Sequence, residues 1–401
     1  LAQFSFNVIS PPVQVDANDK NALRQLLKKK NNSARMTLMQ LLVPYEHEIM
    51  YDRVVFEPYV HYEDFARQNT SSRVFNLFTG FHAQPSSATI DHNMIEPLLW
   101  HMEHILCASN TAAYEYLLDW LAHLCQRPNK KTGVMVALMS SHQGAGKNIF
   151  WDFVGKHIVG TGHYIVLNDL EQLTGKINAV TENRILTVCD EIGSFGGAHR
   201  SADKLKNIIT QSDQIIERKG FDPVRVRDHN NFVALSNNDW PWKIEAGDRR
   251  HLVLEVSNAR VGNKAYFDNL AHCMNDECGG HFYNMLLRRD ISQWNPMDIP
   301  TTQFKRDLKL LSVPIAIRFM VDCVQNNTPG FAWRDNNEPT SVFSADLYRA
   351  FQEWQHTAGD DREKPSQVQF IRSLTRIGLQ TQNVTINCVQ KKGFKLDREK
   401  I

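Results

Sequence analysis

The sequence predicts an α/β fold in which helices cover a buried parallel sheet, and two observations support this. Short apolar runs alternate with helical stretches between Gly133 and Val256. The runs are largely apolar throughout rather than alternating with polar residues, which is typical of strands buried on both faces of a parallel sheet. The first run also leads through a glycine-rich turn into an amphipathic helical segment. The five predicted strands are residues 134–139, 164–167, 185–189, 232–235 and 251–256.

The regions around this core differ from it in pattern. Residues 1–92 mix short strands, turns and aromatic residues, and we expect an accessory region there. Apolar residues recur at three- and four-residue steps in residues 93–130, which predicts a pair of helices and a candidate oligomerisation collar. The core would occupy residues 131–258, and a helical extension and linker would occupy residues 259–298.

The C-terminal region, residues 299–401, shows helical patterns followed by two short strand candidates. Helices followed by a small hairpin predict a winged-helix-like domain. The helices are expected at residues 308–325, 344–356 and 365–377, and the strands around residues 384–389 and 393–396.

Composition restricts the kinds of partner that the chain can have. Of its 401 residues, 45 are basic and 44 acidic, so the net charge is +1. This balance argues against broad, non-specific coating of nucleic acid. It does not argue against a narrow channel lined by a few basic loops, because whole-chain charge averages over all surfaces.

Cysteine usage and hydropathy indicate an intracellular protein. No apolar run approaches the ~18 residues that a membrane span needs, and no signal peptide is visible. Seven scattered cysteines suit a reducing compartment better than a disulfide framework. His272, Cys273, Cys278 and His281 are of metal-ligand types. Their spacing lacks a C-x-x-C pair, so a helix with buried cysteines is favoured over a zinc site.

The glycine-rich turn has the context of a phosphate-binding loop, because it lies between a predicted strand and a predicted helix. Glycines let backbone N–H groups curl around an anion, and a helix N-terminus adds positive potential. Lys147 can reach the β- and γ-phosphates, so ATP is the predicted ligand. The predicted nucleotide-binding residues are Gly144, Ala145, Gly146, Lys147 and Asn148.

Two positions depart from the common form of this motif. Ser141 stands where its first glycine is expected, and Asn148 stands where Ser or Thr normally binds Mg²⁺. An asparagine amide oxygen can still bind the metal, directly or through water. We therefore predict Asn148 as a magnesium ligand.

Polar residues end two of the predicted strands. Asp190 and Glu191 directly follow one of them. Asp190 would hold Mg²⁺, and Glu191 would orient and deprotonate the attacking water. Asn237 follows another strand and could hydrogen-bond the γ-phosphate or that water. The alternative is an ordinary strand end followed by an asparagine turn.

The sequence resembles superfamily 3 helicases in the order of its motifs along the chain. These are the phosphate-binding loop, the acidic pair, a basic segment and Asn237. More narrowly, they resemble the helicase portion of primase-helicase proteins from phages, poxvirus-type large DNA viruses and virophage-like mobile elements. The resemblance covers roughly residues 70 to 260, and asparagine after the loop lysine is tolerated in that group. The closer match rests on residues 75–81, 144–148, 205–210 and 248–250.

This resemblance implies a hexameric ring of AAA+-like P-loop ATPase domains with sheet order 5-1-4-3-2 and ATP between subunits. Such proteins move 3′-to-5′ along single-stranded DNA at a replication fork, and many carry a primase or polymerase partner or fused domain. It also implies that Asp248-Arg249-Arg250 holds an arginine finger, with Arg249 preferred over Arg250, since a planar, always charged guanidinium suits a phosphate. The alternative is a pair of surface arginines before a strand.

Residues 217–229 resemble the β-hairpin that lines the central channel in that family. The resemblance makes Arg218, Lys219, Phe221 and His229 candidate nucleic-acid contacts, through phosphate, sugar or base. The alternative is a solvated basic hairpin.

These observations predict an ATP-hydrolysing nucleic-acid helicase that works during replication of a virus, phage or mobile element. Three alternatives stay open: an ATPase that remodels or packages nucleic acid without unwinding, a nucleotide kinase, and a non-enzymatic replication scaffold with a degenerate nucleotide site. Ser141 and Asn148 favour the scaffold, whereas Lys147, Asp190 and Glu191 count against it.

Overall fold

The computed structural model describes residues 51–69, 73–169, 171–190, 198–237, 247–311, 313–326, 333, 339–358 and 364–397. The chain divides into two compact units. The first comprises residues 1–53 with 72–75, and the second comprises residues 54–71 with 76–401. Only six residues of the first unit are described, so most of the predicted accessory region lies outside the described residues. Glu191, in the second unit, also lies outside them.

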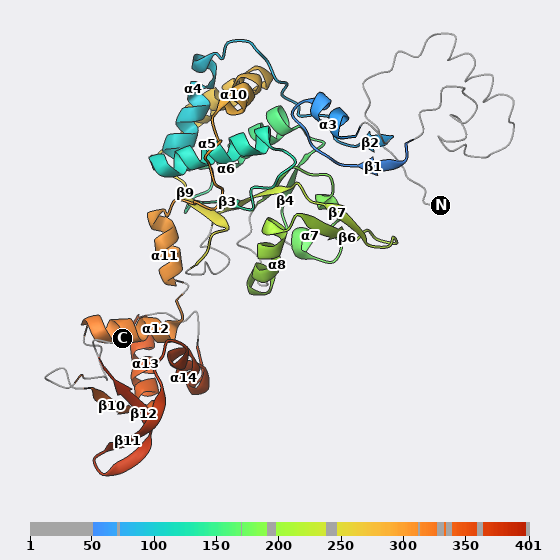
Figure 1. The fold of residues 1–401 in the computed structure, drawn as a ribbon. Helices are drawn as coiled ribbons and strands as arrows, with labels where there is room; N and C mark the ends of the chain where they lie inside the picture. Colours follow the sequence, from blue (N-terminus) through green and yellow to red (C-terminus); the bar gives the residue numbers. More distant parts are fainter. Residues whose placement is uncertain are drawn as a thin grey trace, which may run out of the picture. The chain divides into compact units, whose positions relative to one another are not determined.

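A five-stranded parallel sheet forms the core of the second unit (Figure 1). Its strands are β3 (Met135–Met139), β4 (Tyr164–Leu167), β5 (Leu186–Cys189), β8 (Asn231–Ser236) and β9 (His251–Glu255). They lie in the order β4-β5-β8-β3-β9, with every pair parallel. Counted from β3 along the chain, this order reads 5-1-4-3-2. Each strand falls on one of the five predicted apolar runs.

Helices cover both faces of this sheet because successive side chains of a strand point to opposite faces. Val136 and Leu138 of β3 join one buried cluster, and Met135, Ala137 and Met139 join the other. The first cluster includes residues of α4 (His92–Trp100), the π-helical turn η1 (His101–Leu106), α5 (Thr111–Gln126), α6 (Lys147–Phe153), η2 (Val154–Val159), α9 (Lys264–Cys273) and α10 (Asp276–Arg288). The second includes residues of α7 (Glu171–Thr174), α8 (Ala198–Thr210) and α11 (Gln303–Leu311).

The predicted helical pair over residues 93–130 corresponds to α4 with η1, and to α5. Asn110 caps α5, since its side chain accepts a hydrogen bond from the backbone N–H of Ala113. Both helices contribute buried residues to the core, among them Trp120, which is fully buried. Among the described residues, no helix has the length and apolar character to cross a membrane.

Two small sheets and two short helices complete this part. β1 (Arg53–Val55) and β2 (Val74–Asn76) form one two-stranded sheet. β6 (Asp213–Ile216) and β7 (Val224–Arg227) form an antiparallel hairpin. α3 (Tyr62–Gln68) follows β1, and the 3-10 turn η3 (Ala179–Thr181) precedes β5.

The C-terminal residues form a module with its own buried cluster, which includes Phe319, Phe351, Phe370 and Phe394. Its sheet is antiparallel, in the order β10-β12-β11. Its elements are α12 (Ile315–Asn326), β10 (Thr340–Phe343), α13 (Ser344–Ala358), α14 (Gln367–Arg376), β11 (Thr381–Ile386) and β12 (Val389–Leu396).

Two sequence expectations for this region are wrong. The stretch expected as one helix over residues 308–325 is two helices, because Pro314 separates α11 from α12. Phe304 and Leu308 of α11 pack against the core sheet. The expected strand at residues 384–389 contains the hairpin turn itself, where Asn387 and Cys388 adopt φ values of 50° and 62°. Asparagine tolerates this left-handed conformation better than most residues, so it suits a tight turn.

Candidate nucleotide-binding site

The glycine-rich turn connects the carboxyl end of β3 to α6, which begins at Lys147. Gly144 and Gly146 have φ values of 73° and 90°, a region that favours glycine. Gly146 has a second constraint, because a Cβ there would lie 2.5 Å from Cε1 of His101. The sequence therefore dictates this turn both by backbone conformation and by lack of space.

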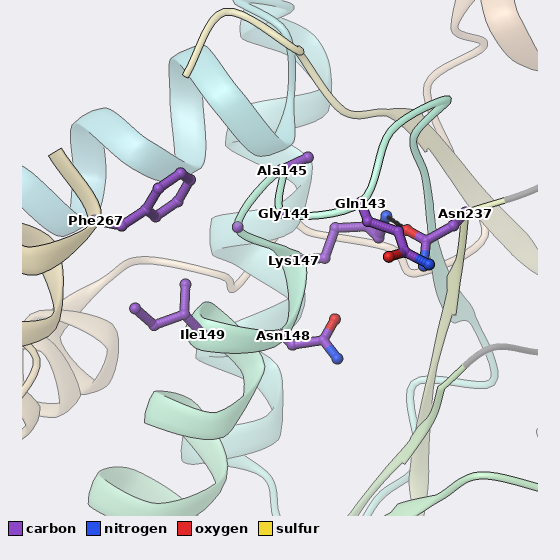
Figure 2. Close-up of a pocket in the computed structure, with 9 residues that line it drawn as sticks. Gln143, Gly144, Ala145, Lys147, Asn148, Ile149, Asn237 and Phe267 are labelled. Carbon is purple, nitrogen blue, oxygen red and sulfur yellow. Dashed lines mark hydrogen bonds between the residues drawn. The ribbon is translucent and has the colours of Figure 1, made fainter. Parts of the chain in front are cut away.

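Lys147 is buried, with only 4% of its surface exposed. Its ammonium group donates to Oγ of Ser140, and to Oδ1 of Asn237 at 2.6 Å. Figure 2 shows the side chains of Lys147 and Asn237 converging. Burial lowers the pKa of Lys147 to about 8, although the nearby charge of Asp190 opposes this shift. Both hydrogen-bond acceptors of Lys147 are neutral groups, a hydroxyl and an amide. Because its pKa stays above 7, most Lys147 side chains remain charged at neutral pH.

Asn148 joins the loop to the next strand end. Its Nδ2 donates to Oδ2 of Asp190 at 2.5 Å. Asp190 directly follows β5, and Asn237 directly follows β8. The carboxyl ends of three parallel strands therefore bring together Lys147, Asn148, Asp190 and Asn237, four of the residues singled out in the sequence.

A cavity of about 390 Å³ opens beside Lys147, Asn148 and Asn237, and Asp190 is joined to it through its hydrogen bond with Asn148. It is in the size range of small-molecule sites, which is about 300–1,000 Å³. Figure 2 shows Asn237 on one side of the loop, with Phe267 and Ile149 on the other. The cavity thus has a polar end and an apolar end. Its lining consists of Gln143, Gly144, Ala145, Gly146, Lys147, Asn148, Ile149, Asn237 and Phe267.

His101 supports the loop from behind, and the sequence patterns did not reveal it. It is fully buried in η1, and burial lowers its pKa to about 4, although its bond to Gly146 opposes the shift. Its Nε2 lies 3.1 Å from the carbonyl oxygen of Gly146, and its Nδ1 lies 2.8 Å from the hydroxyl of Tyr266. Because a carbonyl can only accept, the neutral ring donates from Nε2 and accepts from Tyr266 at Nδ1. No motif links His101 to a loop so far along the chain.

Arg249 and Arg250 lie at the amino edge of the sheet, where its strands begin, and so opposite the carboxyl edge that holds Lys147. They precede β9, and the N–H of Met135, the first residue of β3, donates to the carbonyl of Arg250 at 2.8 Å. Lys147 follows the other end of β3. The five residues of β3 span roughly 17 Å at about 3.3 Å per residue. Arg249 is exposed, and within the described ranges neither guanidinium is recorded in a hydrogen bond or ion pair.

The predicted hairpin is present as β6 and β7, with its tip at residues 217–223. Gly220 at the tip has a φ of 82°. Lys219 is exposed there, as is Phe221, with 55% of its surface accessible. Arg218 instead pairs through two nitrogens with the carboxylate of Glu182, so it anchors the hairpin to the core.

The expectation that His229 contacts nucleic acid is wrong. The hairpin ends at Arg227, and His229 is buried before β8. Its Nδ1 donates to the carbonyl of Asn129 at 3.1 Å, and its ring packs near Phe56. Burial lowers its pKa, which keeps it neutral. A basic-looking sequence segment therefore continues past the hairpin into the core.

A buried ion pair ties the base of the hairpin to the core. Nζ of Lys131 lies 2.6 Å from Oδ2 of Asp228, and both side chains are at most 7% exposed. The same ammonium donates to the carbonyl of Ile208 at the end of α8. Lys131 thus holds the segment that enters β6 and the segment that leaves β7.

Comparisons with known proteins agree with this fold. Residues 138–250 match a model described as a family of unknown function, DUF5906. That segment runs from β3 to Arg250 and includes the residues of the loop, Asp190 and Asn237. The DNA primase-polymerase of Nitratiruptor phage NrS-1 is 29% identical over 143 residues, which are 35% of this chain and 19% of that protein. The matched part thus spans about a fifth of the curated relative.

Two solved structures share the fold. An apo structure of the NrS-1 C-terminal region aligns with a TM-score of 0.61 and 17% identity, covering 86% of this chain and 84% of that one. Its A-form apo structure aligns with a TM-score of 0.60 and 17% identity, covering 94% and 90%. The expected similarity to a phage protein that carries a primase is confirmed. The chain is therefore a relative of a phage DNA primase-polymerase and has the fold of that protein's C-terminal region.

Proposed function

We propose that this chain is the ATP-hydrolysing motor of a superfamily 3 DNA helicase, acting as a hexameric ring in the replication of a virus, phage or mobile element. One observation carries the proposal. Lys147, Asn148 and Asn237 line one cavity at the carboxyl edge of a parallel sheet, and Asp190 accepts a hydrogen bond from Asn148 there. Phosphoryl transfer depends mainly on positioning and charge neutralisation, which such a set of groups can provide.

The polar end of the cavity suits the phosphates of ATP, and its apolar end suits the base. Backbone N–H groups of residues 144–148 and the ammonium of Lys147 would bind its phosphates, and Phe267 with Ile149 would contact the base. Asn148 and Asp190 offer the oxygen ligands that Mg²⁺ prefers. When bound, Mg²⁺ neutralises charge on the phosphate oxygens. Asn237 would orient the attacking water, and Glu191, next to Asp190 in the chain, would accept its proton.

Arg249 would act in a neighbouring subunit. It lies across the sheet from its own Lys147, so the length of β3 separates it from its own loop. Its exposed guanidinium suits a phosphate presented by another copy. Arg250 lies in the same turn and is half-buried, and it would be a secondary contact for that phosphate. A site completed in this way needs at least two subunits, which supports a ring.

Lys219 and Phe221 would contact single-stranded DNA from the hairpin tip. An exposed lysine beside an exposed aromatic ring supplies one contact for phosphate and one stacking surface. The arrangement of α12, α13 and α14 with a three-stranded antiparallel sheet supports a winged-helix-like C-terminal domain. Because its relative is a primase-polymerase, we expect a primase or polymerase as a partner or fused domain.

Unwinding of a forked DNA is the experiment that separates this proposal from its rivals. The chain should displace a labelled strand only with hydrolysable ATP, and Lys147→Ala should abolish both hydrolysis and displacement. A Lys219→Ala/Phe221→Ala variant should keep basal hydrolysis but lose displacement. Hydrolysis without displacement under all conditions would support a remodelling or packaging ATPase. Equal inactivity of the parent and Lys147→Ala would support the scaffold.

A further inference from the structure

The turn that carries Arg249 and Arg250 is attached to α11 by a buried cluster of one carboxylate, one ammonium group and one imidazole ring. Nδ1 of His251 lies 2.8 Å from Oδ1 of Asp248, and Nζ of Lys305 lies 3.0 Å from its Oδ2. All three side chains are at most 5% exposed. Burial alone would raise the pKa of Asp248, but the hydrogen bond from His251 and the charge of Lys305 outweigh it and hold that pKa well below its usual range.

Lys305 also binds the backbone on both sides of the arginine pair. Its Nζ donates to the carbonyl of Asp248 at 3.3 Å and to that of His251 at 2.7 Å. These are the residues immediately before Arg249 and immediately after Arg250. One ammonium group therefore fixes the two ends of a turn whose exposed residue is Arg249.

Lys305 is itself held in place by the first turn of α11. Oγ1 of Thr302 donates to the carbonyl of Val253 in the edge strand β9 at 2.8 Å, and the N–H of Lys305 donates to the same Oγ1 at 3.1 Å. Phe304 and Leu308 pack α11 against the sheet. The ammonium thus comes from a rigid element rather than from a free side chain.

We propose that Lys305 is a positioning residue for the arginine finger: it holds the turn between Asp248 and His251 so that Arg249 reaches the nucleotide of the neighbouring subunit. This rests on the proposed site between subunits. A purely structural role for the same cluster would support β9 in every subunit alike. If Lys305 positions the finger, substituting it should lower ATP hydrolysis only in a subunit whose own Arg249 is used.

Mixing of variant subunits distinguishes the two roles. Lys147→Ala subunits keep their finger, and Arg249→Ala subunits keep their phosphate-binding loop. A mixture should therefore recover ATP hydrolysis, through the finger of the first acting on the loop of the second. Lys305→Met is then added to either partner, and the rate of phosphate release is measured with single-stranded DNA present.

With Lys305→Met on the Lys147→Ala subunit, we expect recovered hydrolysis to fall about 10- to 100-fold, since a misplacement of about 1 Å can cost that much. With Lys305→Met on the Arg249→Ala subunit, recovery should be unchanged, because that finger is already absent. Lys305→Arg on the first subunit should restore part of the rate.

Equal recovery in both arrangements would overturn the positioning role, and so would equal loss in both if Asp248→Asn also gives equal loss. Equal loss is also what an unfolded variant gives, and a conservative Asp248→Asn change in the same two arrangements must then show the asymmetry for the proposal to stand. If the parent mixture itself recovers no activity, Arg249 does not act across subunits, and both the proposed site between subunits and the role of Lys305 fall.

Discussion

The two edges of the central sheet each bury lysines, but they use them differently. At the carboxyl edge, Lys147 donates to a hydroxyl and an amide beside an open cavity. At the amino edge, Lys131 and Lys305 each face a buried carboxylate. A buried charge without a full counter-charge is costly, and an arriving anion relieves that cost. A lysine with neutral partners therefore suits ligand binding, whereas a lysine paired with an acid anchors structure.

The largest effect should come from breaking an anchor at the amino edge. Lys131→Met leaves Asp228 buried without its ion pair, and removing one partner of such a pair typically costs about 3–5 kcal/mol. We expect a loss of that size in the free energy of unfolding, measured by denaturant titration. Adding Asp228→Asn should recover part of the loss. A double variant no more stable than the single one would show that the pair does not anchor the hairpin.

At the carboxyl edge the expected effect is on rate rather than stability. Asp190→Asn should lower kcat for ATP hydrolysis by about 10²–10³-fold, the usual cost of removing one charged or polar group from a transition state. The free energy of unfolding should change little, because Asp190 is only partly buried. Asp298→Asn, an exposed acid away from the site, is the matched control. Similar rates for both variants would contradict the assignment of Asp190.

The apolar end of the cavity should contribute a smaller effect, on binding alone. Phe267→Ala removes an aromatic wall, and contacts of this size are worth about 1.5–3 kcal/mol when fully buried. Because Phe267 is only partly buried, we expect KM for ATP to rise about 10-fold with kcat nearly unchanged. Steady-state kinetics test this, and a fall in kcat without a change in KM would place the base elsewhere.

An effect of similar size needs no substitution and follows from the pKa of Lys147, which burial lowers to about 8. Only the protonated ammonium attracts phosphate, so affinity is present below this pKa and is lost as pH rises through it. Between pH 7 and pH 9 the dissociation constant for Mg·ATP should increase about 10-fold, since each pH unit above a pKa lowers the charged fraction tenfold. Lys147→Ala should show no such dependence. A flat profile in the native chain would contradict the predicted titration.

The two edges also differ in how far the sequence could predict their functional residues. Residues at the carboxyl edge sit in recognisable patterns, because Lys147 follows a glycine-rich turn and Asp190 and Asn237 follow apolar strands. Lys131 and Lys305 lie in segments without such patterns, and only the fold brings them to Asp228 and Asp248. His101 and Phe267 likewise reach the loop from helices distant in sequence.

The wrong expectations have a common physical origin. His229 belongs to a basic-looking stretch, but tertiary packing buries it under Phe56. Pro314 and Asn387 interrupt segments that apolar patterns alone had joined. In each case a local pattern was overridden by a contact or a backbone restriction that the pattern does not encode.

Equilibrium binding of Mg·ATP tests most directly whether Lys147 and Asp190 share one nucleotide. The native chain should bind with an affinity that requires Mg²⁺. Lys147→Ala should weaken binding by about 100-fold, given that hydrogen bonds to charged groups contribute about 1.5–3 kcal/mol each. Asp190→Asn should remove most of the dependence on Mg²⁺. If Lys147→Ala binds as tightly as the native chain, the nucleotide does not occupy this site and the proposed motor is wrong.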